Sequence, residues 1–138
     1  MGSYQELIFY QKARQVAKDI NALIGKWPKT MQAQEISRQL FRSASSVGAN
    51  IAEGHGRHQG TEYIHYLIIA QGSANETEHW LHTAQDCELG PHQQIDQILQ
   101  INNEVVRMIT TTINTLRGKQ RTKSIREGHT DYITDSIE

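Results

Sequence analysis

The chain has 138 residues, 37% of them hydrophobic and 21% charged, which is enough to bury the core of one globular domain. No apolar run approaches the length of a membrane span, and the first residues lack the basic and apolar regions of a secretory signal. A net charge of −1 argues against a dedicated, strongly basic nucleic-acid binder, and the single cysteine, Cys87, excludes an internal disulfide and predicts a cytoplasmic protein.

The first predicted helix follows an apolar stripe from Leu7 to Ile24 and ends at Gly25, because Pro28 cannot continue a helix. The second is predicted to start near Thr30, whose side chain suits an N-cap. It is expected to end within residues 54–56, where two glycines would supply left-handed backbone. The apolar face of this helix repeats at spacings of four and three residues: Ile36, Leu40, Ala44, Val47 and Ile51.

The third predicted helix runs from Gly60 or Thr61 to Asp86 or Cys87, and Gly90 closes it before Pro91 opens the next. Gly72 and Ser73, together with Gly48 of the second helix, are expected to let the two helix axes approach closely. The fourth helix carries apolar residues from Ile95 to Leu116. After Gly118 the periodicity is lost, which predicts a mobile polar tail.

These four helical segments and the absence of strand alternation predict an all-α fold. Short connections favour an antiparallel up-down-up-down four-helix bundle over residues 1–117, followed by a flexible polar tail over residues 118–138. The second and third helices carry apolar or small residues on more than one side. We therefore expect a second buried surface on them, and hence a homo-oligomer.

The charges are spread unevenly along the chain. Residues 1–53 carry seven Lys/Arg against four Asp/Glu, residues 54–116 carry two against seven, and residues 117–138 carry five against four. Such asymmetry is more often a solvated surface or a subunit contact than a phosphate-binding site. If RNA or DNA binds, the predicted contacts are Lys12, Lys18, Arg38, Arg117, Lys119, Arg121, Lys123 and Arg126.

Two stretches of the sequence carry a family resemblance. Arg42, Ser46-Val47, Asn50-Ile51-Ala52-Glu53-Gly54 and Arg57 resemble the signature of the four-helix-bundle proteins encoded in bacterial 23S rRNA intervening sequences, the S23 family. Ala70-Gln71-Gly72-Ser73, followed by Glu76 or Glu78, resembles the second signature of that family. Trp27-Pro28 stands where the family usually has an aromatic residue and a proline. The resemblance covers about residues 4–117.

The resemblance implies a bundle that assembles as a ring, typically a homopentamer, without known enzymatic activity. It also implies a relation to the accessory proteins of diversity-generating retroelements, which are pentameric bundles that bind a reverse transcriptase and nucleic acid. The chain departs from those proteins in being less basic. His55 also replaces the aromatic residue that commonly precedes the Gly-x-Arg sequence.

The polar residues of the two signatures allow two interpretations. We expect Arg42, Asn50, Glu53, Arg57 and Glu78 to be structural, as ion pairs and packed hydrogen-bonding groups that fix how the helices align. The alternative is a phosphate or ligand site built from Arg38, Arg42 and Arg57.

A metal site and an enzyme are both less favoured. His55 and His58, His79 and His82, and two Glu-x-x-His pairs have helical chelating spacing, but both Glu-x-x-His pairs lie on the third helix. A di-iron site needs such pairs on separate helices. No glycine elbow surrounds a serine. The sequence thus predicts no catalytic residues, metal or cofactor. It favours a scaffold or nucleic-acid/protein adaptor over a reverse-transcriptase accessory subunit or a metal-binding bundle.

Overall fold

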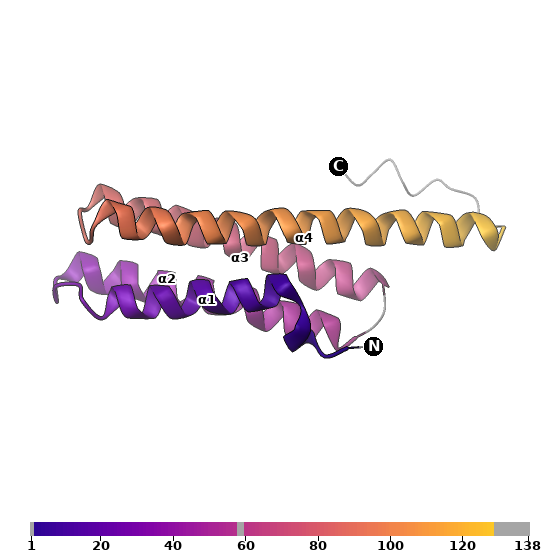
Figure 1. Ribbon diagram of the computed structural model, residues 1–138, viewed down its shortest axis with the longest axis horizontal. Helices are drawn as coiled ribbons and strands as arrows, with labels where there is room; N and C mark the ends of the chain where they lie inside the picture. The colour runs from indigo at the N-terminus through magenta and orange to yellow at the C-terminus, as the bar shows by residue number, and fades with distance from the viewer. Residues whose placement is uncertain (1, 58–59, 129–138) are drawn as a thin grey trace.

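The computed structural model describes residues 2–57 and 60–128. A short 3₁₀ turn, η1 (Tyr4–Glu6), precedes four helices: α1 (Ile8–Ile24), α2 (Met31–His55), α3 (Gly60–Asp86) and α4 (His92–Arg126). Figure 1 shows that neighbouring helices run in opposite directions and that the α1–α2 and α3–α4 connections share one end. The predicted all-α, antiparallel four-helix bundle is therefore confirmed.

The start of α2 follows the expected capping chemistry. Thr30 is the N-cap of α2, and its side-chain oxygen accepts a hydrogen bond from the Ala33 N–H at 3.2 Å. The expected left-handed glycines at the end of α2 are wrong, because Gly56 has a φ of −66° and remains in the right-handed region. Its N–H instead donates to the Ala52 carbonyl oxygen at 3.2 Å, which satisfies one of the last carbonyls of the helix.

α3 ends at Asp86, as predicted, but the residue that closes it differs from the prediction. Glu88, not Gly90, takes the left-handed conformation, with a φ of 54°. The Leu89 N–H donates to the Ala84 carbonyl oxygen and the Glu88 N–H to the Gln85 carbonyl oxygen, both at 3.0 Å. This pair of bonds is a Schellman motif, so α3 closes two residues before the glycine.

The end of α4 corrects the predicted start of the tail. Residues 118–126 are helical, so α4 continues ten residues beyond Leu116, its last apolar stripe residue. Figure 1 shows α4 projecting past the other helices. The apolar stripe stops because no helix remains to pack against, whereas Lys, Arg and Gln still favour helical backbone. Residues 129–138 of the expected tail lie outside the described residues.

The core consists of two apolar clusters separated by a buried polar layer. One cluster lies at the end of the bundle that holds Trp27, and the other contains Phe9. Between them lie Ser43, Thr77 and Asn102, each at most 3% exposed. The hydroxyl oxygens of Thr77 and Ser43 are 2.9 Å apart. The Asn102 side-chain amide donates to the Ala74 carbonyl oxygen at 2.9 Å.

Within residues 2–57 and 60–128, none of the helices combines the length and the apolar character that crossing a membrane requires.

Candidate interaction surfaces

α2 and α3 approach each other closely at Gly54. A Cβ atom added there would lie 2.6 Å from the Tyr66 Cβ, so only glycine fits. The expected approach points Gly48 and Gly72 are wrong: Gly48 faces the Tyr10 ring with ordinary room for a Cβ, and nothing lies within 4 Å of one at Gly72.

Ser73 does bring the two helices together, as predicted. Its Oγ lies 2.9 Å from the Ser46 Oγ. The Asn50 side-chain amide donates to the Ser46 carbonyl oxygen at 2.8 Å and lies 3.0 Å from the Ser46 Oγ. The three side chains form a half-buried row along α2 and α3 that holds Asn50 in a fixed orientation.

Ion pairs hold the arginines of the first signature. Arg42 pairs with Glu76 across α2 and α3, whereas Glu78 is exposed and makes no ion pair with any described residue. Arg57 Nη2 lies 2.8 Å from the Glu53 carboxylate, as the four-residue spacing predicts.

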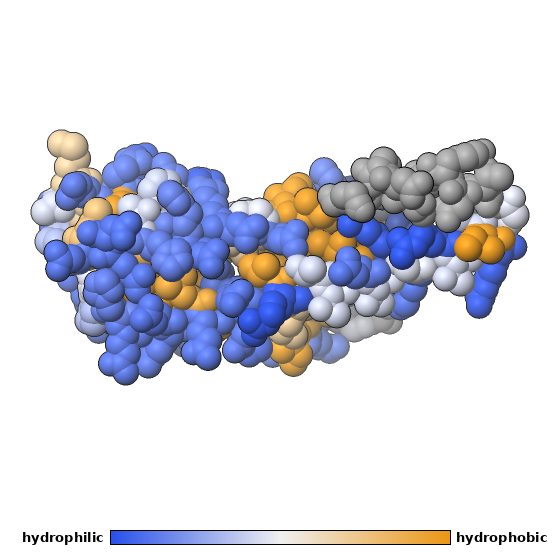
Figure 2. Space-filling model, turned by 90° about the horizontal axis from the view of Figure 1, so that it is seen from above, coloured by the Kyte–Doolittle hydropathy of each residue, from blue (hydrophilic) through white to orange (hydrophobic). Residues whose placement is uncertain are grey.

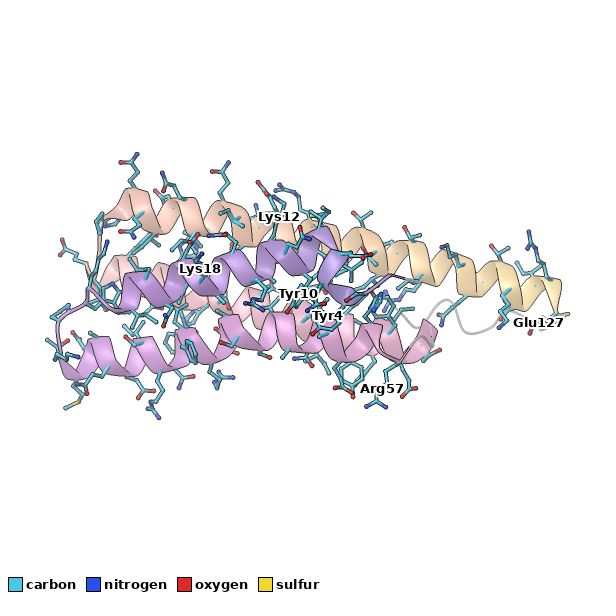
Figure 3. All side chains as sticks on the ribbon, turned by 60° about the horizontal axis from the view of Figure 1, so that its bottom comes forward. Tyr4, Tyr10, Lys12, Lys18, Arg57 and Glu127 are labelled. Carbon is cyan, nitrogen blue, oxygen red and sulfur yellow. The ribbon has the colours of Figure 1, made fainter. Side chains whose placement is uncertain are left out.

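Besides its ion pair with Glu53, Arg57 contacts an aromatic ring and a second carboxylate. The Arg57 guanidinium carbon lies 5.5 Å from the Tyr66 ring centroid, and its Nη1 lies 3.9 Å from a carboxylate oxygen of Glu62. Its hydrogen bond to Glu53 raises the pKa of the guanidinium. Burial raises the pKa of the neighbouring Tyr63 phenol. Figure 3 shows Arg57 pointing away from the bundle at the end of α2.

The alternative phosphate site is not assembled in this arrangement. Arg38 pairs with Glu35, Arg42 with Glu76 and Arg57 with Glu53, so each arginine already has its own carboxylate. Arg38 lies on α2 and Arg57 follows just after its end, 19 positions later, about 28 Å along the helix direction. The three guanidinium groups therefore do not converge on one ligand.

The predicted nucleic-acid contacts fall into two sets. Lys12 on α1 forms an ion pair with Glu104 of α4 at 2.8 Å, and this hydrogen bond lowers the pKa of the Glu104 carboxyl. Lys18 is exposed on α1. Figure 3 shows Lys12 and Lys18 on α1, whereas Glu127 marks the far end of α4, beyond α1. The structure thus separates Lys12, Lys18 and Arg38 from the predicted contacts at the projecting end of α4.

The other five contacts gather on the projecting end of α4. Residues 117–126 contain five Lys/Arg and no Asp/Glu. Lys119, Lys123 and Arg126 have the spacing of one helix face and border one open hollow, with Glu127 at its edge. We call these three residues the basic face of α4. The sequence did not predict this face, because residues 118–126 were expected to be a tail.

Apolar side chains also reach the surface. Ile68 and Ile69 on α3 are 41% and 38% exposed and lie one helical turn before Gly72. Phe41 on α2 is 52% exposed and borders a groove of about 490 Å³ that Trp27 and Pro28 also line. Figure 2 shows apolar groups at the surface over the middle of the molecule, between hydrophilic areas.

The described residues contain no group of three or more His, Cys, Asp or Glu side chains that could hold a metal ion. His79 packs edge-on against Trp80 and His55 against Tyr63. His58, the expected partner of His55, lies outside the described residues.

Fold and surfaces together define an all-α bundle whose distinctive residues lie on its outer faces. The chain belongs to the 23S rRNA-intervening sequence protein family, whose model matches residues 5–111. The expected S23 family membership is therefore confirmed.

A solved structure supports the same membership. It is the crystal structure of a protein with unknown function from the S23 ribosomal protein family of Bacteroides thetaiotaomicron VPI-5482. That protein is 27% identical, with a TM-score of 0.69 over 77% of this chain and 98% of its own. None of the curated proteins matches the chain.

Proposed function

We propose that the protein is a non-enzymatic cytoplasmic adaptor that assembles with copies of itself and binds RNA or DNA through the projecting end of α4. One observation carries the proposal. Five Lys/Arg without an Asp/Glu occupy residues 117–126, on a helix end that projects past the bundle. Phosphate backbones bind such basic clusters without base-specific contacts.

The nucleic-acid part is tested by reversing the charges of the basic face. We expect the variant Lys119→Glu/Lys123→Glu/Arg126→Glu to bind a fluorescent single-stranded RNA or DNA at least tenfold more weakly at 50 mM salt. We also expect the slope of log affinity against log salt to be shallower, by about two, because three phosphate contacts are lost.

A matched control has the same net charge. Lys18→Glu/Lys26→Glu/Lys29→Glu reverses three exposed lysines away from α4 and is expected to weaken binding less than threefold. Equal losses in both variants would show that only net charge matters, and would contradict a binding site on α4.

Self-assembly is supported by the outer face of α3. Gly72 occupies the middle of a 27-residue helix, where glycine costs about 1 kcal/mol relative to alanine, and no contact within the protomer requires it. The exposed Ile68 and Ile69 lie one turn away. A second copy packed on this face would bury both isoleucines and use the small size of Gly72. The family resemblance favours five copies.

The mass of the particle in solution tests self-assembly. We expect light scattering of the wild-type chain to give a multiple of 15.7 kDa, with five copies favoured. Gly72→Arg is expected to reduce that mass, whereas Thr111→Arg, on an exposed position of α4, leaves it unchanged. A wild-type monomer at micromolar concentration would contradict the assembly.

The non-enzymatic assignment and the partner remain proposals. The described surface grooves are open, and the signature side chains are engaged in structural contacts, which supports a binding role. A reverse transcriptase is the protein partner that the resemblance implies. Its test is co-purification of the wild-type chain with a reverse transcriptase encoded beside it.

A further inference from the structure

Two blocks of opposite charge follow one another at the end of α4. Residues 117–126 carry five bases and no acid, and residues 127–138 carry four acids and no base. The acids are Glu127, Asp131, Asp135 and Glu138. The two blocks together are therefore close to neutral, although the helix end alone is strongly basic.

The described part of the acidic block already meets the basic face of α4. The Glu127 carboxylate lies 3.9 Å from the Lys123 ammonium group, and Glu127 borders the same hollow as Lys119 and Arg126. Gly128 has a φ of 76°, in the left-handed region. A left-handed residue after a helix C-cap turns the chain off the helix axis, and Gly128 is such a residue.

We propose that residues 127–138 are an acidic segment that competes with nucleic acid for the basic face of α4. This inference rests on the proposed function and adds a preference for one class of ligand to it. Only a ligand with several adjacent phosphates displaces the segment, whereas mononucleotides and short fragments do not.

The acidic segment is long enough to reach along the whole basic face of α4. The basic face runs from residue 119 to residue 126, seven helical steps, which is about 11 Å. Residues 129–138 can extend to at most about 33–36 Å. A covalently attached segment of this length acts at a millimolar effective concentration. The carboxylates therefore compete with free phosphates even where each ion pair is weak.

The competition depends on salt in a defined way. Ion pairs on an exposed helix are screened within about 8 Å at physiological ionic strength. The segment consequently weakens nucleic-acid binding most at low salt. Its effect decreases as salt rises, while binding itself also becomes weaker.

The first test neutralises the segment without shortening it. We expect the full-length variant Asp131→Asn/Asp135→Asn/Glu138→Gln to bind a fluorescent 20-nucleotide single-stranded RNA at least fivefold more tightly than wild type at 50 mM salt. At 300 mM salt the difference is expected to be below twofold. The control Glu78→Gln/Asp86→Asn/Glu88→Gln changes the net charge equally on exposed positions of α3 and its end, and is expected to gain less than twofold. Equal gains in the two variants would overturn the proposal.

The second test needs no nucleic acid. We expect neutralising the segment to increase the acetylation rates of Lys119 and Lys123 at least twofold relative to Lys18, as measured by mass spectrometry. Unchanged rates would overturn the proposal. If neither wild type nor variant binds RNA or DNA, the proposed function fails, whereas the acetylation rates still decide whether the segment covers the basic face.

Discussion

Two glycines of this bundle stand in opposite surroundings, although both occupy helix positions. Gly54 is buried where a Cβ would meet the Tyr66 Cβ and the Tyr63 ring, whereas a Cβ at Gly72 would meet nothing within 4 Å. Periodicity places both glycines on helices but does not reveal which one touches a neighbour. The sequence therefore indicated Gly48 and Gly72 as approach points and missed Gly54, because the rotation of α2 against α3 depends on packing.

Alanine substitution is expected to change the free energy of unfolding in opposite directions at the two glycines. We expect Gly54→Ala to lower the free energy of unfolding by roughly 1–3 kcal/mol, because the opposing Cβ is anchored to the backbone of α3 and must shift. We expect Gly72→Ala to raise it by about 1 kcal/mol, through helix propensity alone. Urea denaturation at a concentration where the protomers are dissociated measures both. Changes of the same sign would contradict this account.

Glu88 occupies a backbone conformation that suits glycine better. Its φ of 54° places it in the left-handed region, which costs a residue with a Cβ about 1 kcal/mol or more. We expect Glu88→Gly to raise the thermal midpoint by a few degrees. Glu78→Gly, an exposed position inside α3, serves as the control and is expected to lower it. A lower midpoint for Glu88→Gly would contradict the Schellman closure of α3.

The helices differ in how well the sequence predicts their ends. The start of α2 follows directly from Thr30, whose side chain caps the helix, and the start of α4 follows from Pro91, whose ring fixes a φ of −61°. The end of α4 was missed because an apolar stripe reports burial rather than helicity, and the projecting residues have nothing to bury against. Likewise, both Glu76 and Glu78 were suitable partners for Arg42, and the packing of α2 on α3 selects Glu76.

The ion pair between α1 and α4 makes stability depend on pH. Lys12 lowers the pKa of Glu104 in the fold below its ordinary value of 4.5. The pair therefore stabilises the fold fully above the ordinary pKa and loses its contribution as the pH falls through the lowered one. We expect Glu104→Gln to reduce the loss of stability between about pH 5 and pH 3, measured by urea denaturation at a series of pH values. In a Lys12→Met background the same substitution should have no further effect, and an unchanged difference there would assign the pH dependence to other carboxyl groups.

At the scale of the whole molecule, the bundle and its projecting end are separate in their contacts. The end of α4 contacts α3 through Gln120, whose amide donates to the Thr61 hydroxyl at 3.0 Å. The core clusters contain no residue beyond Leu116. Composition and periodicity were enough to predict the four-helix fold, whereas the outer surfaces depend on helix rotation and on partners that one sequence does not encode.

Truncation tests this separation. We expect a chain of residues 1–117 to keep its helical circular dichroism per residue and to lose no more than about 1–2 kcal/mol of unfolding free energy, the value of a hydrogen bond and its packing. A chain that ends at residue 112 also loses Ile113, which is 4% exposed, and is expected to lose at least about 2–5 kcal/mol. Loss of cooperative unfolding in the 1–117 chain would show that the end of α4 belongs to the folding unit.

The buried layer of Ser43, Thr77 and Asn102 has a consequence for helix register. Sliding α3 by one turn against α2 would keep apolar residues facing apolar residues in much of the core, so hydrophobic burial alone distinguishes such alternatives poorly. The same slide would part the Thr77 and Ser43 hydroxyls, which would then keep only the bonds within their own helices, Thr77 to the Ser73 carbonyl oxygen and Ser43 to the Leu40 carbonyl oxygen. The lost hydrogen bond is worth about 0.5–1.5 kcal/mol, so the layer favours the one register in which the two hydroxyls pair.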